Sequence, residues 1–269
     1  GILQAMGFRD YGVLTVLING DEEVSSPGSR SLITQLGSEH DLVLSFESIG
    51  GPDSIQLTTA GIAAVQLKVT GRAAHAGGAP QRGRNALYEL AHQILQTRDL
   101  SNASTGVKMN WTLANAGSAR NVIPAEAKAT ADVRVLRAAD YGRIEQQIRD
   151  RMRRKSIPDT TVEVVFERVR PPLEATPASR AVATHAQRVY RRIGRRLSVQ
   201  IAASGGGTDA AFAALETKAA VLEGFGLKGF GAHSDNAEYI EIPSIEPRLY
   251  LMTRMIMDVA AGAAGDTTN

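Results

Sequence analysis

Apolar runs alternate with amphipathic stretches along the first 60 residues. A helical tail ends at Gly7, an apolar run covers 12–19, an amphipathic stretch covers about 27–37, and a second apolar run covers 41–47. Continuous apolar strands of this kind are typical of parallel sheets with both faces covered. The pattern therefore predicts a mostly parallel α/β sheet with strands at 12–19 and 41–47.

The pattern changes near Gly61, where looser alternation begins. The expected elements are strand 62–69, helix 85–97, strands at about 106–116 and 126–136, helix 141–155 and strand 161–166. The order β-α-β-β-α-β is the ferredoxin-like arrangement. Because the paired prolines 171–172 favour an extended linker, we expect an inserted α+β domain at 61–171.

The α/β rhythm returns after residue 175. It predicts helix 178–193, strand 197–202, helix 208–215, strand 219–223 and helix 244–261. The sequence therefore predicts a catalytic-type α/β domain made of 1–60 and 172–269, interrupted by the inserted domain.

Composition narrows the class of protein. Hydrophobic residues make up 43% and charged residues 22%, as in a soluble globular protein, and no apolar stretch is clean enough to cross a bilayer. Because there is no cysteine, disulfides and Cys-ligated zinc are excluded. The compartment stays open between the cytoplasm and a bacterial periplasm.

The net charge is only +2, but basic residues crowd 149–155 and 188–196. Both runs fall on polar faces of expected helices and lack interleaved aromatic residues. A solvated helix face is therefore favoured over a nucleic-acid surface.

Carboxylates follow the two N-terminal apolar runs. Glu22 and Glu23 come after the first run, and Glu47 ends the second. Open α/β sheets bind ligands at the C-terminal ends of their strands, and clustered carboxylates need a positive partner. One carboxylate can bind a divalent metal while its neighbour takes a proton from water. A solvated acidic turn before a helix is the alternative.

Two histidines have a suggestive setting. His233 follows strand 219–223 in a glycine-containing loop, which suits a metal ligand or an ordinary surface histidine. His75 lies among alanines and glycines that let other groups approach its ring closely. That setting fits an oxyanion-stabilising role or an ordinary turn.

Several polar positions suit a substrate carboxylate. The turn 204–209, which contains Gly206 and Thr208, offers free N–H groups before a helix but lacks the lysine of a P-loop. Asn121 and Arg134 could also hold a carboxylate, or be surface residues.

Seven segments taken together resemble the M20 metallopeptidases, and within them the glutamate carboxypeptidase branch. Single segments are weak signals, but seven in family order are specific. They are GDEE at 20–23, LSFES at 44–48, VTGRAAHAGGAP at 69–80, NVIPAEA at 121–127, ADVR at 131–134, SGGGTDAA at 204–211 and GAHSDNAEY at 231–239.

The resemblance implies a two-zinc hydrolase that releases a C-terminal amino acid, with glutamate the candidate, from an N-acyl or peptide amide. It implies that the inserted domain is a lid that forms a homodimer. The roles it implies are general base for Glu22, zinc ligands for Glu23, Glu47 and His233, oxyanion stabilisation across the dimer for His75, and substrate binding for Asn121, Arg134, Gly206 and Thr208.

The resemblance also implies ligands that this sequence lacks. Family members carry a His-x-Asp segment and a bridging aspartate before the Glu-Glu pair, whereas 1–11 contains no histidine and only Asp10. We therefore expect an N-terminally truncated catalytic domain that binds zero or one zinc ion and is inactive alone. A non-catalytic dimerising fragment or binding module is the alternative, and nucleic-acid binding is the least favoured hypothesis.

Overall fold

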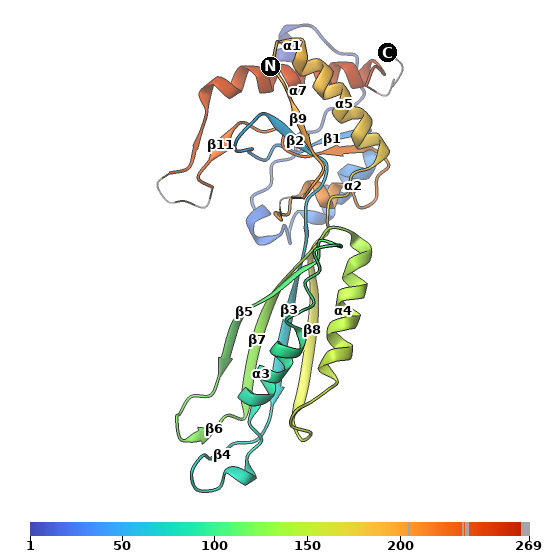
Figure 1. Ribbon diagram of the computed structural model, residues 1–269. Helices are drawn as coiled ribbons and strands as arrows, with labels where there is room; N and C mark the ends of the chain where they lie inside the picture. Colours follow the sequence, from blue (N-terminus) through green and yellow to red (C-terminus); the bar gives the residue numbers. More distant parts are fainter. Residues whose placement is uncertain (204, 233, 235–236, 265–269) are drawn as a thin grey trace. The chain divides into compact units, whose positions relative to one another are not determined.

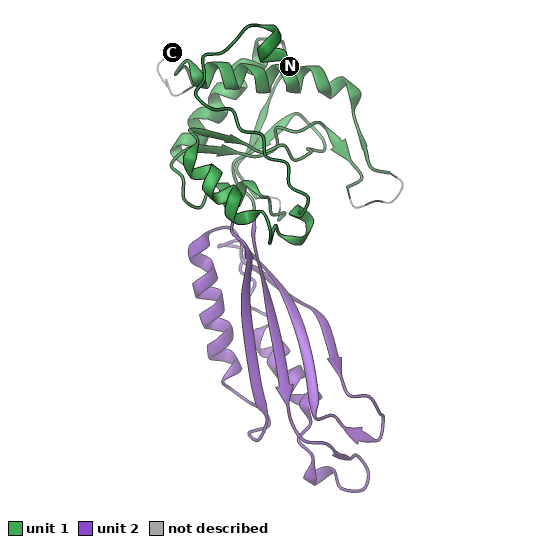
Figure 2. Cartoon of the chain, turned by 180° about the vertical axis from the view of Figure 1, so that it is seen from behind, with its two compact units in different colours: residues 1–59, 173–269 green, residues 60–172 purple. Residues whose placement is uncertain are grey.

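The chain divides into two compact units. The computed structural model describes residues 1–203, 205–232, 234 and 237–264 (Figure 1). Unit 1 comprises Gly1–Thr59 and Leu173–Asn269, and unit 2 comprises Ala60–Pro172 (Figure 2). Unit 2 is thus a continuous segment inserted into unit 1.

Unit 2 is a four-stranded antiparallel sheet with two helices on one face. Its strands lie in the order β5 (Lys108–Ala116), β7 (Glu126–Val135), β3 (Gly61–Thr70) and β8 (Thr161–Arg170), and its helices are α3 (Ala86–Thr97) and α4 (Ala138–Met152). One helix connects the first two strands in sequence, and the other connects the last two. This order is the β-α-β-β-α-β arrangement that the sequence predicts.

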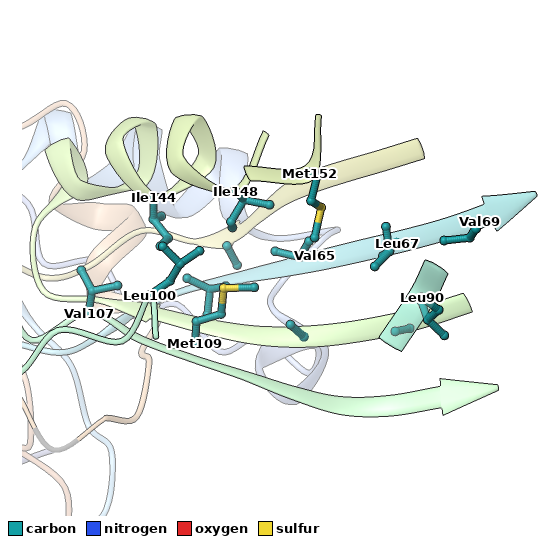
Figure 3. Packing of buried hydrophobic residues seen from close by; sticks show 14 of the residues in the cluster. Val65, Leu67, Val69, Leu90, Leu100, Val107, Met109, Ile144, Ile148 and Met152 are labelled. Carbon is teal, nitrogen blue, oxygen red and sulfur yellow. The ribbon is translucent and has the colours of Figure 1, made fainter. Parts of the chain in front are cut away.

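The core of unit 2 follows from alternation along the strands. Val65, Leu67 and Val69 of β3 are buried and point to the helical face, where Ile148 and Met152 of α4 join the same cluster (Figure 3). Successive side chains of a strand point to opposite faces, so every second residue packs against the helices.

Unit 1 is built on short parallel strand pairs. The pairs are β1 (Leu42–Leu44) with β10 (Ala220–Leu222), and β2 (Ser54–Gln56) with β9 (Ser198–Gln200). The flanking helices are α2 (Arg30–Glu39), α5 (Pro177–Arg191), α6 (Ala210–Ala213) and α7 (Ile245–Ala260).

Helices cover both faces of the β1–β10 pair. Leu44 and Leu222 belong to the cluster that contains residues of α5 and α7. Val43 and Val221 belong to the cluster that contains residues of α2 and α6. This double covering explains why β1 and β10 are apolar throughout, and it agrees with the predicted mixed α/β class.

The remaining elements are short. They are α1 (Ile2–Ala5), η1 (Glu22–Val24), η2 (Pro80–Arg82) and η3 (Ile242–Ser244), with the antiparallel pairs β4 (Ala74–His75) and β6 (Val122–Ile123), and β11 (Gly229–Phe230) and β12 (Tyr239–Ile240). No helix in the described part of the chain has both the length and the apolar character needed to cross a bilayer.

The strand predicted at 12–19 is wrong. In the described structure this segment joins no sheet, and Val13, Val16 and Ile18 are 74%, 77% and 90% exposed. The Thr15 hydroxyl is hydrogen-bonded to Nε2 of His40 at 2.8 Å instead. An apolar run becomes a strand only where a neighbouring strand satisfies its backbone groups, and no described strand does so here.

Candidate functional site

Glu47 and Glu223 follow the two strands of the parallel β1–β10 pair. Leu44 is in register with Leu222, and the N–H of Ser45 donates to the carbonyl of Leu222 at 2.9 Å. Because the strands are parallel, the residues that follow them emerge at the same edge. The fold therefore brings together two carboxylates that are far apart in the sequence.

Two glycines let the segments beyond these strands approach closely. Gly224 has a φ of +86°, in the left-handed region that favours glycine. A Cβ on Gly226 would collide with the carbonyl oxygens of Phe46 and Glu47. A larger residue at 226 would therefore displace the backbone that carries Glu47.

Glu223 is buried, with only 3% of its surface exposed. Its carboxyl accepts hydrogen bonds from the hydroxyl of Thr208 and the N–H of Gly224. Burial raises the pKa of Glu223, although these hydrogen bonds act in the opposite direction. The sequence analysis missed this residue, yet Glu223 ends the run 219–222 just as Glu47 ends its own run.

Glu47 lies in a strongly negative environment. Burial by the surrounding protein, and then the negative charges of Glu223, Glu22, Asp209 and Glu23, raise the pKa of Glu47 to about 7, although part of its side chain reaches solvent. The structure thus gathers Glu22, Glu23 and Glu47 in one region. Their repulsion would be relieved by a bound cation.

Glu22 and Glu23 lie on the short helix η1, which Asp21 fixes from its N-terminal end. The Asp21 carboxylate accepts hydrogen bonds from the Ser29 hydroxyl at 2.5 Å, the Gly28 N–H at 2.8 Å and the Ser29 N–H at 3.2 Å. These bonds, first that of the Ser29 hydroxyl, lower the pKa of Asp21. Asp21 therefore stays charged and organises the turn at neutral pH.

The donor chemistry of this region suits a divalent metal, since carboxylates are ligands for zinc and other divalent ions. Among the residues described, however, no three Asp, Glu, His or Cys side chains converge on a common point. His233, the predicted third ligand, lies outside the described residues.

Thr208 and Gly206 lie in the turn before α6 and differ in accessibility. Gly206 is exposed, whereas Thr208 is 2% exposed and its hydroxyl donates to Glu223. The Thr208 hydroxyl is therefore engaged within the protein, and its predicted contact with substrate stays a prediction.

In unit 2, the β4–β6 pair brings His75 beside Asn121. The N–H of Ala76 donates to the carbonyl of Asn121 at 2.9 Å. Nδ1 of His75 accepts from the N–H groups of Gly77 at 3.2 Å and Gly78 at 2.9 Å. In the neutral ring the proton is then on Nε2, so the exposed imidazole offers an N–H donor.

Arg134 is held by its near neighbour Asp132. Nε of Arg134 donates to Oδ2 of Asp132 at 2.8 Å, and Nη2 donates to Oδ1 at 3.0 Å. The guanidinium is partly exposed. This two-bond pair fixes the orientation of the guanidinium.

Arg134 and the His75–Asn121 pair lie at opposite ends of the sheet of unit 2. Arg134 pairs with the first residues of β3, whereas β4 and β6 adjoin the other end, where Thr70 is in register with Glu126. The eight steps from Glu126 to Arg134 span roughly 26 Å at ~3.3 Å per step. One small ligand therefore cannot contact both groups of a single chain.

The basic run 149–155 is largely engaged in contacts within the protein. Arg149 pairs with Glu145 at 2.9 Å, Arg151 pairs with Asp99, and Nζ of Lys155 donates to the carbonyl of Thr160 at 2.7 Å. These contacts agree with the interpretation of the run as a solvated helix face.

Sequence comparisons find one family model and a close relative. Residues 57–160 match the M20 peptidase dimerisation domain. Carboxypeptidase G2 of Pseudomonas sp. strain RS-16 is 44% identical over 262 residues, which cover 97% of this chain and 63% of that protein. The chain thus spans less than two thirds of the length of this relative.

Solved structures share the fold at low sequence identity. Aminopeptidase PepT from Bacillus cereus superimposes with a TM-score of 0.77 at 20% identity, covering 96% of this chain and 67% of that one. The YXEP protein of Bacillus subtilis, described as a dinuclear metal-binding peptidase of the M20 family, gives 0.69 at 13% identity, covering 89% and 63%.

Proposed function

This chain is a relative of the M20 peptidases along nearly its whole length, and from that premise we propose that the protein is a metal-dependent amide hydrolase. We propose zinc as the metal and an N-acyl or peptide amide with a free C-terminal carboxylate as the substrate. The similarity to carboxypeptidase G2 favours a carboxypeptidase activity, and the resemblance to the glutamate carboxypeptidase branch makes glutamate the candidate leaving amino acid.

One observation carries the proposal: the parallel β1–β10 pair and η1 gather several carboxylates in unit 1. The charges of Glu223, Glu22 and Glu23 contribute to raising the pKa of Glu47 to about 7. A fold that only needed a solvated acidic surface would spread these charges apart. A divalent cation offsets their repulsion, and a metal in this class of site polarises a carbonyl and acidifies water.

The residues of the chain have distinct proposed roles. Glu23, Glu47 and His233 would hold metal. Glu22 would take a proton from the attacking water and return it to the leaving amine, as a general base and then a general acid. The turn at Gly206 would receive a substrate carboxylate through its N–H groups.

His75 would stabilise the developing oxyanion, and Asn121 beside it would bind the substrate carboxylate. The tautomer set by Gly77 and Gly78 gives His75 an Nε2–H, which is the donor that an oxyanion requires. Arg134, held by Asp132, would bind a substrate carboxylate. Because the sheet separates Arg134 from the His75–Asn121 pair, we propose that these two groups act on one substrate only when two chains contribute them.

A homodimer through unit 2 supplies such an arrangement. The match to a dimerisation domain covers most of unit 2. Its β5 lies at an edge of the sheet, where a strand has unpaired backbone groups. Leu113 of β5 and Tyr88 and Leu95 of α3 are 68%, 68% and 58% exposed, and a partner chain would cover them.

Zinc titration of the purified chain with substitution variants tests the proposal. We expect zero or one zinc ion per chain and no cleavage of an N-acyl glutamate by the chain alone. Glu23→Gln and Glu47→Gln should weaken zinc binding by at least the roughly 10–100-fold that outer-sphere partners cost. Glu22→Gln should leave zinc affinity unchanged, and in a catalytically competent form of the protein should lower kcat by roughly 10²–10⁴-fold.

Glu39→Gln is the matched control, because Glu39 is an exposed glutamate at the end of α2 in the same unit. Zinc binding that is insensitive to both Glu23→Gln and Glu47→Gln would contradict the proposal. Undiminished turnover by Glu22→Gln in the catalytically competent form of the protein would also contradict it.

A further inference from the structure

Asp209 connects two points of the segment that carries Glu22 and Glu23. Its Oδ2 accepts a hydrogen bond from Nδ2 of Asn19 at 2.7 Å, and its Oδ1 accepts from the hydroxyl of Ser26 at 2.5 Å. Asn19 precedes the acidic turn and Ser26 follows it. One carboxylate is therefore hydrogen-bonded to the residues that flank the turn on both sides.

The turn depends on such outside support. Ser25 and Ser26 have φ values of +69° and +54°, which cost energy for a residue with a side chain. The helix η1, which lies between Asn19 and Ser26, is only three residues long. Ser26 is completely buried, so its hydroxyl needs an acceptor, and Asp209 provides it.

The side chain of Asp209 makes these contacts and does not cap a helix. It stands at the N-cap position of α6, but its side chain accepts no capping hydrogen bond there. The Asn19 side chain also donates to Ser29 at 3.2 Å, which joins Asp209 to the group that Asp21 organises. The network thus leads from α6 to both ends of the acidic turn.

We propose that Asp209 is a positioning residue, whose carboxylate holds Asn19 and Ser26 and so fixes the direction of Glu22 and Glu23. This role rests on the proposed function for its catalytic consequence, but its structural part stands by itself. A carboxylate is required because both of its oxygens accept, whereas an amide offers a single acceptor oxygen.

Amide hydrogen exchange of the full chain, followed by NMR, tests the inference. The reporters are the N–H groups of Ser25 and Ser26, which donate to the carbonyls of Glu22 and Asp21, both at 2.8 Å. In Asp209→Ala these two amides should exchange roughly tenfold or more faster, because about one to two hydrogen bonds no longer hold the turn closed. Asp209→Asn should give partial rescue, since it keeps one acceptor.

The control is Asp41→Ala, which removes an exposed aspartate beside β1 in the same unit. A general structural role would accelerate exchange throughout unit 1, including the Ser45 N–H that pairs with Leu222. Uniform acceleration, or unchanged exchange at Ser25 and Ser26, would overturn the inference.

A double-mutant comparison locates the action of Asp209. Asn19→Ala should accelerate the same two amides in the wild-type background and add little in Asp209→Ala, because the partners are already separated. Additive effects would show that Asn19 and Asp209 act independently, and would overturn the inference.

Zinc affinity measured on the same proteins separates this idea from the proposed function. Weaker zinc binding in Asp209→Ala, together with faster exchange confined to the Ser25 and Ser26 amides, supports the positioning role of Asp209 and the proposed metal site. The metal proposal fails by itself if zinc binding does not respond to Glu23→Gln and Glu47→Gln, whereas the exchange data decide whether Asp209 holds the turn even if the wild-type chain binds no zinc.

Discussion

The hydroxyl of Tyr141 joins the two strands at which the chain enters and leaves unit 2. It shares its proton between the carbonyl oxygens of Ile62, at 3.2 Å, and Arg170. Any Cβ at Gly61 would collide with this hydroxyl, so glycine is required there. The ends of β3 and β8 are thus connected through one side chain.

Tyr141→Phe should destabilise unit 2 by about 1–2 kcal/mol, since buried carbonyls lose a donor. It should also change the response to alkaline pH. Burial raises the pKa of Tyr141 from 10.0 to about 12, so the stability linked to its protonated form is present below pH 10 and lost as pH rises toward 12. The Phe variant lacks this loss.

Urea unfolding at pH 7 and pH 11, followed by Trp111 fluorescence, measures both effects. Trp111 is the single tryptophan and lies in unit 2, so its fluorescence reports on the unit that contains Tyr141, whereas Tyr190, whose pKa burial also raises to about 12, lies in unit 1. Tyr239→Phe, at an exposed position on β12 outside the proposed interface, is the control. Equal alkaline destabilisation of wild type and Tyr141→Phe would contradict the assignment.

The site residues show what the sequence could and could not reveal. Glu47 was identified because a carboxylate at the end of an apolar strand is a local signal, and Glu223 carried the same signal. The contacts of Asp209 with Asn19 and Ser26 span 190 and 183 positions, so they exist only after the fold has formed. No local pattern encodes such a pairing.

At the scale of elements, the pattern located amphipathic helices and antiparallel strands well. The helix expected at 85–97 is α3, Ala86–Thr97, and the strand expected at 126–136 is β7, Glu126–Val135. The failure at 12–19 has a physical cause, because hydrophobicity reports burial on average and says nothing of the neighbouring strand. Whether a segment forms a strand therefore depends on a second segment that can pair with it.

The exposed side chains of β5 and α3 lead to a prediction, at the scale of elements, about how two chains associate. The double substitution Leu95→Glu with Leu113→Glu should convert the proposed homodimer into a monomer, since desolvating two charges in an interface is costly. Light scattering coupled to size-exclusion chromatography measures the mass, and circular dichroism checks that the fold persists.

Val165→Glu is the matched control for this prediction. Val165 is 55% exposed on β8, the strand at the other edge of the same sheet. It should leave the dimer intact. Dissociation by Val165→Glu, or a dimer that survives the double substitution on β5 and α3, would place the interface elsewhere.

At the scale of the whole molecule, each unit contains its own hydrophobic core. The cluster of unit 2 draws all its members from residues 63–166, and the two clusters of unit 1 draw theirs from outside 60–172. A segment that is continuous in sequence and has its own hydrophobic core meets the physical requirements for folding alone.

We therefore expect residues 60–172, expressed as a fragment, to fold and to unfold cooperatively by Trp111 fluorescence, with the stability of unit 2 in the full chain. Leu67→Ala removes a buried side chain of this core and should cost about 2–5 kcal/mol in both contexts. Leu222→Ala makes the equivalent cavity in unit 1 and should leave the Trp111 transition of the full chain unchanged. If Leu222→Ala shifts that transition as far as Leu67→Ala does, the two units unfold as one and are energetically coupled.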